Sequence, residues 1–315
     1  MEMKKLSKKS FEEIRLWVYR NARQFELALW QYEFENGSKE AVLSALAYYQ
    51  NDDGGFGNAL EPDSWNPEST PYTTKVVIDL LRSIDFVDAK HPIIQGMLKF
   101  FESGKHREEY GWLWSIPSNE NHAHAPWWNY DPKMNENYYI DITPKIVCFL
   151  LQFAEKDSAL YQQAIAFTNR LLADLKKPEN KQKALHGRYA LSEMIKQLGL
   201  TDQFEISHLT DNLKAHIDET ICRDVSQWTD YNVKPSEFIP SPNSPFLLGN
   251  EATVHTELDY LIEIRPENNV WGITWKWWDN YDKYPKEFAI SEHWWKSWIA
   301  IEKLKFLRAF DRLDV

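Results

Sequence analysis

The chain has few cysteines and no long apolar run. Its two cysteines, Cys148 and Cys222, cannot build a disulfide framework, and so low a number favours a reducing compartment. No stretch approaches the roughly 20 apolar residues of a membrane-spanning helix. The segment after the first ten residues is charged, unlike the apolar core of a secretory signal. We therefore expect a cytoplasmic protein without a membrane span.

An excess of basic residues is also missing. Lys and Arg number 36 against 47 Asp and Glu, which gives a net charge of −11 within an ordinary globular composition. Such a balance argues against a nucleic-acid partner and against a disordered tail protein. The phosphate-binding loops Gly-x-x-x-x-Gly-Lys-Ser/Thr and Gly-x-Gly-x-x-Gly do not occur either. The sequence thus indicates no particular cofactor.

Large aromatic side chains, in contrast, are abundant. The 15 Trp, 15 Tyr and 16 Phe make up 15% of the chain and suit either a thick core or an aromatic cavity. Many occupy long connections, which are uncommon in compact domains unless they carry function. Trp114, Trp127, Trp128 and Trp275 are therefore expected to line a pocket, with ordered packing of the loops as the alternative. The long connections are 51–70, 104–142, 223–249 and 265–287.

Hydrophobic periodicity predicts about ten helices and few strands. Ser10 and Glu13 are spaced as a capping box, which predicts a helix start, and Gly37 ends this first run. Thr70 and Pro71 predict another start, because proline suits the first helical turn. The remaining expected helices are 38–49, 92–103, 143–155, 158–176, 181–198, 205–222, 250–264 and 288–312.

Two segments of the chain repeat each other without a gap. Residues 46–57 align with 261–272, and each contains a helix end, a polar turn and an aromatic residue followed by glycine. Trp112 marks a weaker third copy and Trp228 a still weaker fourth. Intervals of this length accommodate a helix pair, so the repeat predicts stacked or circularly arranged helical hairpins. The turn residues tolerate positive φ, and the aromatic residue is expected to staple neighbouring helices.

The segment 50–57 (QNDDGGFG) resembles the Gln-to-aromatic repeat of terpenoid cyclases and of the protein prenyltransferase β subunit. More closely, 53–63 (DGGFGNALEPD), 122–128 (HAHAPWW), 241–246 (SPNSPF) and the Trp-rich C-terminus are similar to uncharacterised bacterial prenyltransferase-like or cyclase-like proteins. The resemblance implies an all-α fold, an α/α toroid of about five to six helical hairpins formed as one domain by residues 1–315. It also implies a central cavity that takes an apolar or isoprenoid-like ligand.

The residues that define the chemistry of those families are missing. The chain has no Asp-x-Asp-Asp acid motif, and Asp52-Asp53 continues into Gly54 and Gly55 where magnesium-dependent synthases carry Asp-Asp-x-x-Asp. Cys148 lies in an apolar run and matches no zinc motif. Whether the protein is an enzyme therefore stays open.

Glu61 and Asp63 are the strongest catalytic candidates in the sequence. They flank Pro62, which stiffens the pair, in a segment that contains no Lys or Arg. Two close carboxylates repel, so one can hold a proton near neutral pH and act as an acid while the other acts as a base. They could instead hold a cation, cap a helix or accept from backbone amides.

His122 and His124 lie two residues apart in an aromatic loop. An extended backbone would point both the same way, but the zinc coordination set would need a third ligand that the sequence does not provide. Hydrogen-bonded loop histidines are the simpler interpretation, with His124 as a possible proton-transfer partner of Glu61 and Asp63.

Three functional classes remain open on these grounds: a cyclase-like protein, a carbohydrate-active α/α-barrel hydrolase or lyase, and a non-catalytic binding or scaffold protein. Ring faces stabilise carbocations in the first class and stack on sugars in the second. The expected partner is a small-molecule or oligosaccharide ligand. The residues expected to contact it are Asp53, Phe56, Trp114, His122, Trp127, Trp128 and Trp275.

Overall fold

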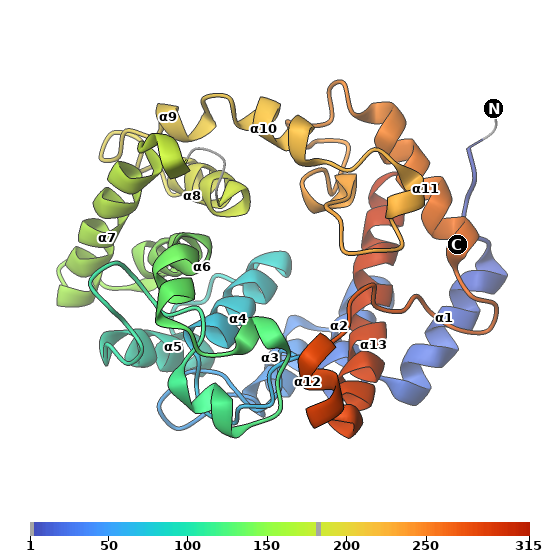
Figure 1. The fold of residues 1–315 in the computed structure, drawn as a ribbon, viewed down its shortest axis with the longest axis horizontal. Coiled ribbons are helices and arrows are strands. Elements are labelled where there is room, and N and C mark those ends of the chain that lie inside the picture. The colour runs from blue at the N-terminus through green and yellow to red at the C-terminus, as the bar shows by residue number, and fades with distance from the viewer. Residues whose placement is uncertain (1–2, 181–183) are drawn as a thin grey trace. The chain divides into compact units, whose positions relative to one another are not determined.

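The computed structural model describes residues 3–180 and 184–315, and within them the chain is built from helices and turns (Figure 1). Extended residues in these two ranges form isolated bridges but no strand. The predicted all-α class is therefore confirmed. No helix in the described ranges combines the length and apolar character needed to cross a membrane.

The chain forms two compact units, of which unit 1 comprises residues 1–46 and 214–315 and unit 2 comprises residues 47–213. The toroid over 1–315 stays a prediction. Unit 1 carries α1 (Lys8–Asn21), α2 (Gln24–Phe34), α3 (Lys39–Ala47), α10 (Leu213–Thr220), α11 (Glu251–Ile264), α12 (Trp278–Lys283) and α13 (Pro285–Ala309). Unit 2 carries α4 (Pro71–Ser83), α5 (Pro92–Glu102), α6 (Pro132–Phe153), α7 (Ala159–Leu175), α8 (Leu185–Gln197) and α9 (Ser207–Thr210).

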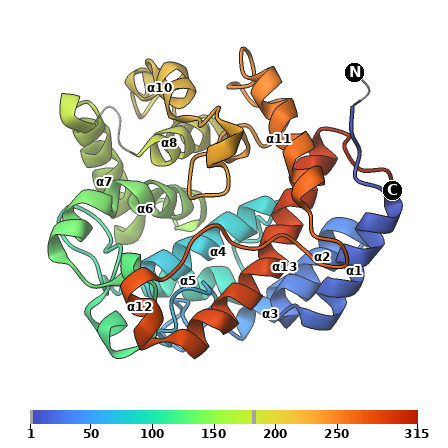
Figure 2. The same ribbon diagram turned by 45° about the vertical axis from the view of Figure 1, so that its right-hand side comes forward.

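Unit 1 is built around the long helix α13, which packs against α1 and α2 (Figure 2). The Phe25 ring meets Trp298 at 5.7 Å between centroids, which fixes α2 against α13. The two ends of the chain pair through Leu6, whose N–H donates to Arg312 and whose carbonyl accepts from Asp314. Buried Arg312 also donates to Asp259 of α11 at 2.7 Å. These contacts explain why distant parts of the sequence form one unit.

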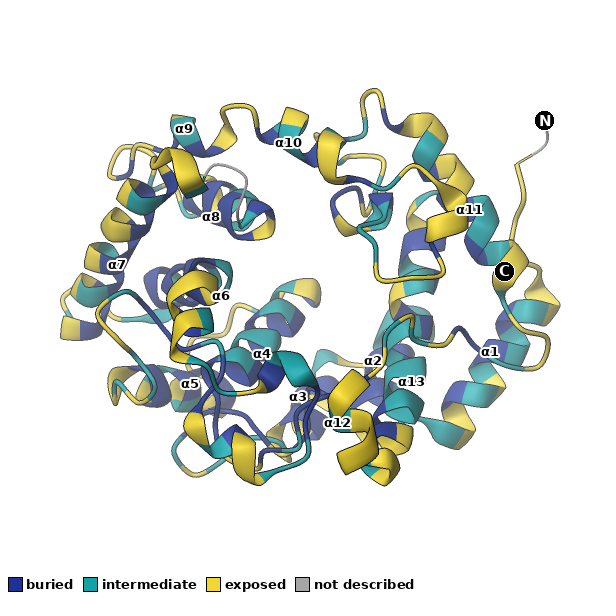
Figure 3. Cartoon of the chain, viewed as in Figure 1, coloured by how far each residue is buried: buried dark blue, intermediate teal, exposed yellow. Residues whose placement is uncertain are grey.

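Unit 2 is organised by α6, which packs on α4, α7 and α8. The helix continues through Pro144, although proline removes a hydrogen bond from the carbonyl four residues earlier. That carbonyl, of Ile140, lies against Gly187 of α8, where an added Cβ would approach it to 2.6 Å. The close approach of α8 therefore covers the position where α6 lacks an internal bond. Buried and exposed residues alternate along neighbouring α7 with helical periodicity (Figure 3).

Several predicted helix boundaries are correct. Thr70 caps α4 by accepting from the N–H of Thr73 at 2.9 Å, and Ser38 accepts from Ala41 at the start of α3. The helices predicted at 92–103, 158–176 and 250–264 match α5, α7 and α11 within two residues. Of the run 181–198, residues 181–183 lie outside the described part, and the rest matches α8.

Other boundaries were wrong. The helix predicted from Ser10 starts earlier, with Ser7 as its cap, and breaks at Ala22, where the Asn21 side chain donates to the Trp17 carbonyl. The run 205–222 splits at Asn212, which has φ of 56°. Proline again sets the start of two helices, because α6 begins at Pro132 and α13 at Pro285, not at the predicted 143 and 288.

The two copies of the sequence repeat form similar corners, one in each unit. The Gln50 side chain donates to the carbonyl of Gly54 at 2.9 Å, and the aligned Arg265 donates to Asn269 at 3.2 Å. Gln50 also reaches the Ile93 carbonyl of α5. The aromatic residue that follows is buried in all four copies, as predicted for a staple. These residues are Phe56, Trp112, Trp228 and Trp271.

Gly54 provides a test of the unit 2 corner. Its φ is +89°, and a Cβ there would lie 2.0 Å from the Gly96 carbonyl oxygen. Gly54→Ala should therefore lower the free energy of unfolding by about 2–5 kcal/mol, the sum of backbone strain and overpacking. The matched variant Gly199→Ala has φ of +67° but nothing within 4 Å, so only the strain of about 1–2 kcal/mol should appear. Urea unfolding followed by circular dichroism measures both, and equal losses would contradict the close approach.

Candidate functional site

All nine predicted site residues outside unit 1 lie in two connections of unit 2, residues 48–70 before α4 and residues 103–131 between α5 and α6. The segments 63–65 and 123–125 run antiparallel, with the Trp65 N–H donating to Ala123 and the Ala125 N–H to Asp63, each at 2.9 Å. This pairing brings the acidic loop and the histidine loop together, as the hypothesis of His124 assisting Asp63 requires.

The three catalytic candidates are deeply buried. Glu61 is 6% exposed, Asp63 1% and His124 2%. The ring nitrogens of His124 lie 2.7 Å from the His122 carbonyl and 2.8 Å from the Asn129 side chain, so the ring orders its own loop. The acid/base role of these residues stays a prediction.

The predicted rings of this loop pack closely together. Trp114 and Trp128 stack with centroids 5.1 Å apart, and Tyr72 of α4 meets both rings within 5 Å. The Trp114 indole N–H donates to the Trp127 carbonyl. Phe56 lies in the core, where its backbone N–H donates to Thr74. The rings of Tyr72, Trp114 and Trp128 therefore pack against one another and form an aromatic layer.

Charged groups missed by the sequence analysis lie beside this layer. Asp79 of α4 accepts from Lys75 at 2.9 Å and from Lys145 of α6 at 2.8 Å, and the Lys75 ammonium lies 5.1 Å from the Tyr72 ring centre. Burial raises the pKa of nearby Asp141 to about 6. The spacing of Lys75 and Asp79 is the signal that could have revealed the pair. Its geometry is that of an ion-pair network that joins two helices.

Asp53 has a different environment, in a shallow depression of unit 2. It accepts from the Gly55 N–H at 3.1 Å and from the Ser69 hydroxyl, and it pairs with Lys105 at 3.3 Å. Although burial acts in the opposite direction, these hydrogen bonds hold the pKa of Asp53 below its usual range. Asp53 therefore fixes the corner turn. Within the described residues, no group of three or more His, Cys, Asp or Glu side chains is arranged to hold a metal ion.

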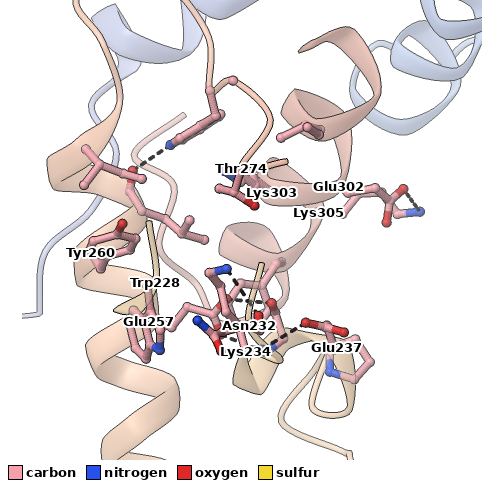
Figure 4. A pocket seen from close by; sticks show the side chains of 18 of the residues that line it. Trp228, Asn232, Lys234, Glu237, Glu257, Tyr260, Thr274, Glu302, Lys303 and Lys305 are labelled. Carbon is pink, nitrogen blue, oxygen red and sulfur yellow. Dashed lines mark hydrogen bonds and ion pairs between the residues drawn. The ribbon is translucent and has the colours of Figure 1, made fainter. Parts of the chain in front are cut away.

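A larger cavity of about 650 Å³ lies in unit 1, between α11, α13 and the loops that follow Asp224 and Arg265. Figure 4 shows Glu257 and Tyr260 along α11 on one side, with Lys303 and Lys305 coming from α13 on the other. Of the residues predicted from the sequence, only Trp275 lines it. This cavity combines rings and charges within one unit and is therefore the candidate site.

Hydrogen bonds fix two of the rings that line the cavity. The indole N–H of Trp271 donates to the Leu261 carbonyl and that of Trp228 to Cys222, each at 2.9 Å. Trp228 also meets Tyr260 edge to face at 5.3 Å. Trp275 is half-buried and approaches Tyr231, which is 77% exposed, at 6.4 Å. The cavity thus has buried rings inside and an accessible pair of rings at its open side.

Glu257 is the buried carboxyl of this cavity, 1% exposed. One of its oxygens accepts from the Ser236 N–H at 2.8 Å and the other is 2.6 Å from the Ser236 hydroxyl. Burial raises the pKa of Glu257 to about 7, against the opposing effect of these two hydrogen bonds. The carboxyl therefore connects α11 to the short helix Pro235–Glu237 and exchanges its proton near neutral pH.

Lys303 is a positive charge of the cavity that packs against a ring. Its ammonium lies 5.4 Å from the Trp271 ring centre, and the described residues place no carboxylate within ion-pair distance of it. Burial and repulsion from Lys234 lower the pKa of Lys303 to about 8, against a smaller attraction to Glu257. A cation–π contact with tryptophan only partly replaces lost hydration.

The two other cations of α13 that line the cavity have carboxylate partners. Lys305 pairs with Glu302 and with Glu33 of α2, each at 3.3 Å, and Arg308 pairs with Glu33 at 2.6 Å. Among the described residues, Lys303 is therefore the α13 cation of this cavity that has no carboxylate within ion-pair distance.

Two sequence signals could have revealed this site. Glu257 follows Val254 by three residues and precedes Leu261 by four, so it falls on the buried face of α11. Lys303 lies four residues after Ile299, which places it on the cavity face of α13. Both were passed over because charged residues in a helix usually belong to its solvated face.

In comparisons with known proteins, no family model, curated protein or solved structure matches the chain.

The buried carboxyl makes stability depend on pH. The pKa of Glu257 is about 7 in the folded protein and 4.5 for an ordinary glutamate, so between these pH values the folded state binds the proton more tightly than the unfolded state does. The free energy of unfolding should therefore fall as pH rises through this window, by about 2–3 kcal/mol from pH 5 to pH 8. Glu257→Gln cannot ionise and should remove this part of the fall.

Thermal and urea unfolding at pH 5, 6, 7 and 8 would measure the difference. Glu251→Gln, on the exposed first turn of the same helix, is the matched control. A variant of Glu257 that loses stability with pH as steeply as the parent protein would contradict the assignment of a buried, proton-binding carboxyl.

Proposed function

We propose that unit 1 binds a saccharide in the cavity between α11 and α13. The observation that carries this proposal is the accessible pair Tyr231 and Trp275 on a cavity whose inner wall presents Glu257 and Lys303. Binding sites commonly combine apolar ring surfaces with a few convergent polar groups that fix orientation. A sugar matches both features, because its C–H faces stack on rings while its hydroxyls reach polar groups.

The charged lining favours a polar ligand over an isoprenoid. Lys234, Glu237, Glu257 and Lys303 all line the cavity, and a hydrocarbon chain would remove water from these groups without replacing its hydrogen bonds. A sugar replaces them with hydroxyls. The carbohydrate alternative from the sequence therefore suits this cavity better than the isoprenoid-like ligand implied by the family resemblance.

The proposal is one of binding. Both Glu257 oxygens are engaged with Ser236, so this carboxyl supports the loop that forms one wall. Tyr260, Asn232 and Thr274 add polar groups to the same lining. The toroid of 1–315, the acid/base role of Glu61 and Asp63, the cyclase-like family and the cytoplasmic location remain separate proposals that rest on the sequence.

Ligand screening tests the proposal directly. Neutral and acidic mono- and oligosaccharides, terpenoids and prenyl diphosphates would each be added to the full chain, with and without magnesium. A bound ligand raises the melting temperature by mass action, and calorimetry then gives Kd. We expect saccharides to bind, and Trp275→Ala and Tyr231→Ala each to weaken binding about tenfold, because each removes a ring on which the sugar stacks.

Trp278→Ala is the matched control, since Trp278 is 60% exposed and does not line the cavity. It should leave Kd unchanged. Stabilisation by terpenoids or prenyl diphosphates alone would refute saccharide binding and favour the ligand class that the resemblance implies. Saccharide binding that survives both cavity substitutions would place the ligand elsewhere.

A further inference from the structure

The cavity of unit 1 carries an ammonium group whose nearest described partner is a ring. Lys303 lies over Trp271, whereas Lys305 and Arg308 on the same helix are paired with Glu33. Glu257, the buried carboxyl of the cavity, has both oxygens occupied by Ser236. Among the described residues, the two other α13 cations that line this cavity therefore have carboxylate partners, whereas Lys303 has none within ion-pair distance.

The surroundings of Lys303 also favour an added negative charge. Lys234 lines the same cavity, and its repulsion affects Lys303 more than the attraction of Glu257 does. A ligand anion would offset this repulsion and make a charge-assisted hydrogen bond, the stronger kind of hydrogen bond.

We propose that Lys303 binds the carboxylate of an acidic sugar whose ring lies against Trp275 and Tyr231. This inference rests on the proposed saccharide function and names the class of saccharide. A single negative charge suits the site better than the double charge of a phosphate, because Glu237 and Glu257 line the same cavity. A sugar acid also carries its carboxylate directly on the ring, so stacking and charge pairing occur in one small ligand.

Matched sugars separate this inference from the general function. Methyl glucuronide and methyl glucoside differ in whether the ring carries a carboxylate or a hydroxymethyl group, and methyl galacturonide and methyl galactoside form a second such pair. Short oligomers of the same four sugars extend the probe to longer ligands. Calorimetry with the full chain gives Kd for each, at constant pH and ionic strength.

We expect the acidic member of at least one pair to bind more tightly. Lys303→Met keeps a chain of similar length without the charge, and it should weaken acidic-sugar binding about 10- to 100-fold while changing neutral-sugar binding less than about twofold. The matched control Lys276→Met removes an exposed lysine outside the cavity and should change neither. Thermal unfolding of each variant verifies that it folds.

The outcomes are distinct. Equal binding of acidic and neutral sugars, or an acidic preference that survives Lys303→Met, would overturn the inference and leave the saccharide function standing. If none of the sugars binds the parent protein, the proposed function fails, and the inference fails with it.

Discussion

Desolvation of charge is the constraint on which the candidate site depends. Removing an ammonium or a carboxyl from water is unfavourable unless another group takes the place of water. In unit 1, Ser236 does this for Glu257, and Glu33 does it for Lys305. For Lys303 the described residues provide a tryptophan face instead. This missing carboxylate is the basis of the proposal that the cavity takes a ligand of negative charge.

The corner of unit 1 forms part of the cavity wall, since Pro266 and Trp271 line it. Arg265 closes the turn after α11 by donating to Asn269, and it also pairs with Glu13 of α1 at 2.8 Å. Trp271 then returns to the end of α11 through its bond to Leu261. The same ring that staples the corner forms the surface under Lys303. The aromatic residue of the unit 1 corner is therefore also part of the candidate site. The aligned Phe56 of unit 2 does not line this cavity.

The sequence predicts the fold class well because local rules determine it. Thr70 before Pro71 marks a helix start on its own, and burial of the aromatic residue after each turn follows from its size. Two contacts account for errors in the predicted helix boundaries, one tertiary and one local. The helix α6 passes Pro144 because α8 covers the freed carbonyl, and the first helix breaks where the Asn21 side chain ends it. Neither contact is visible in hydrophobic periodicity.

The candidate site was predicted less completely than the fold. Trp275 was identified from its long loop. Glu257 and Lys303, in contrast, belong to regular helices, and their buried surroundings arise only because α11 and α13 face the same cavity.

The titration of Lys303 tests this account most directly. Nuclear magnetic resonance of the lysine side-chain carbons, with Lys303→Met used for assignment, would follow it. The account predicts a pKa of about 8 for Lys303 in the protein without ligand, whereas a value near 10.5 would contradict it.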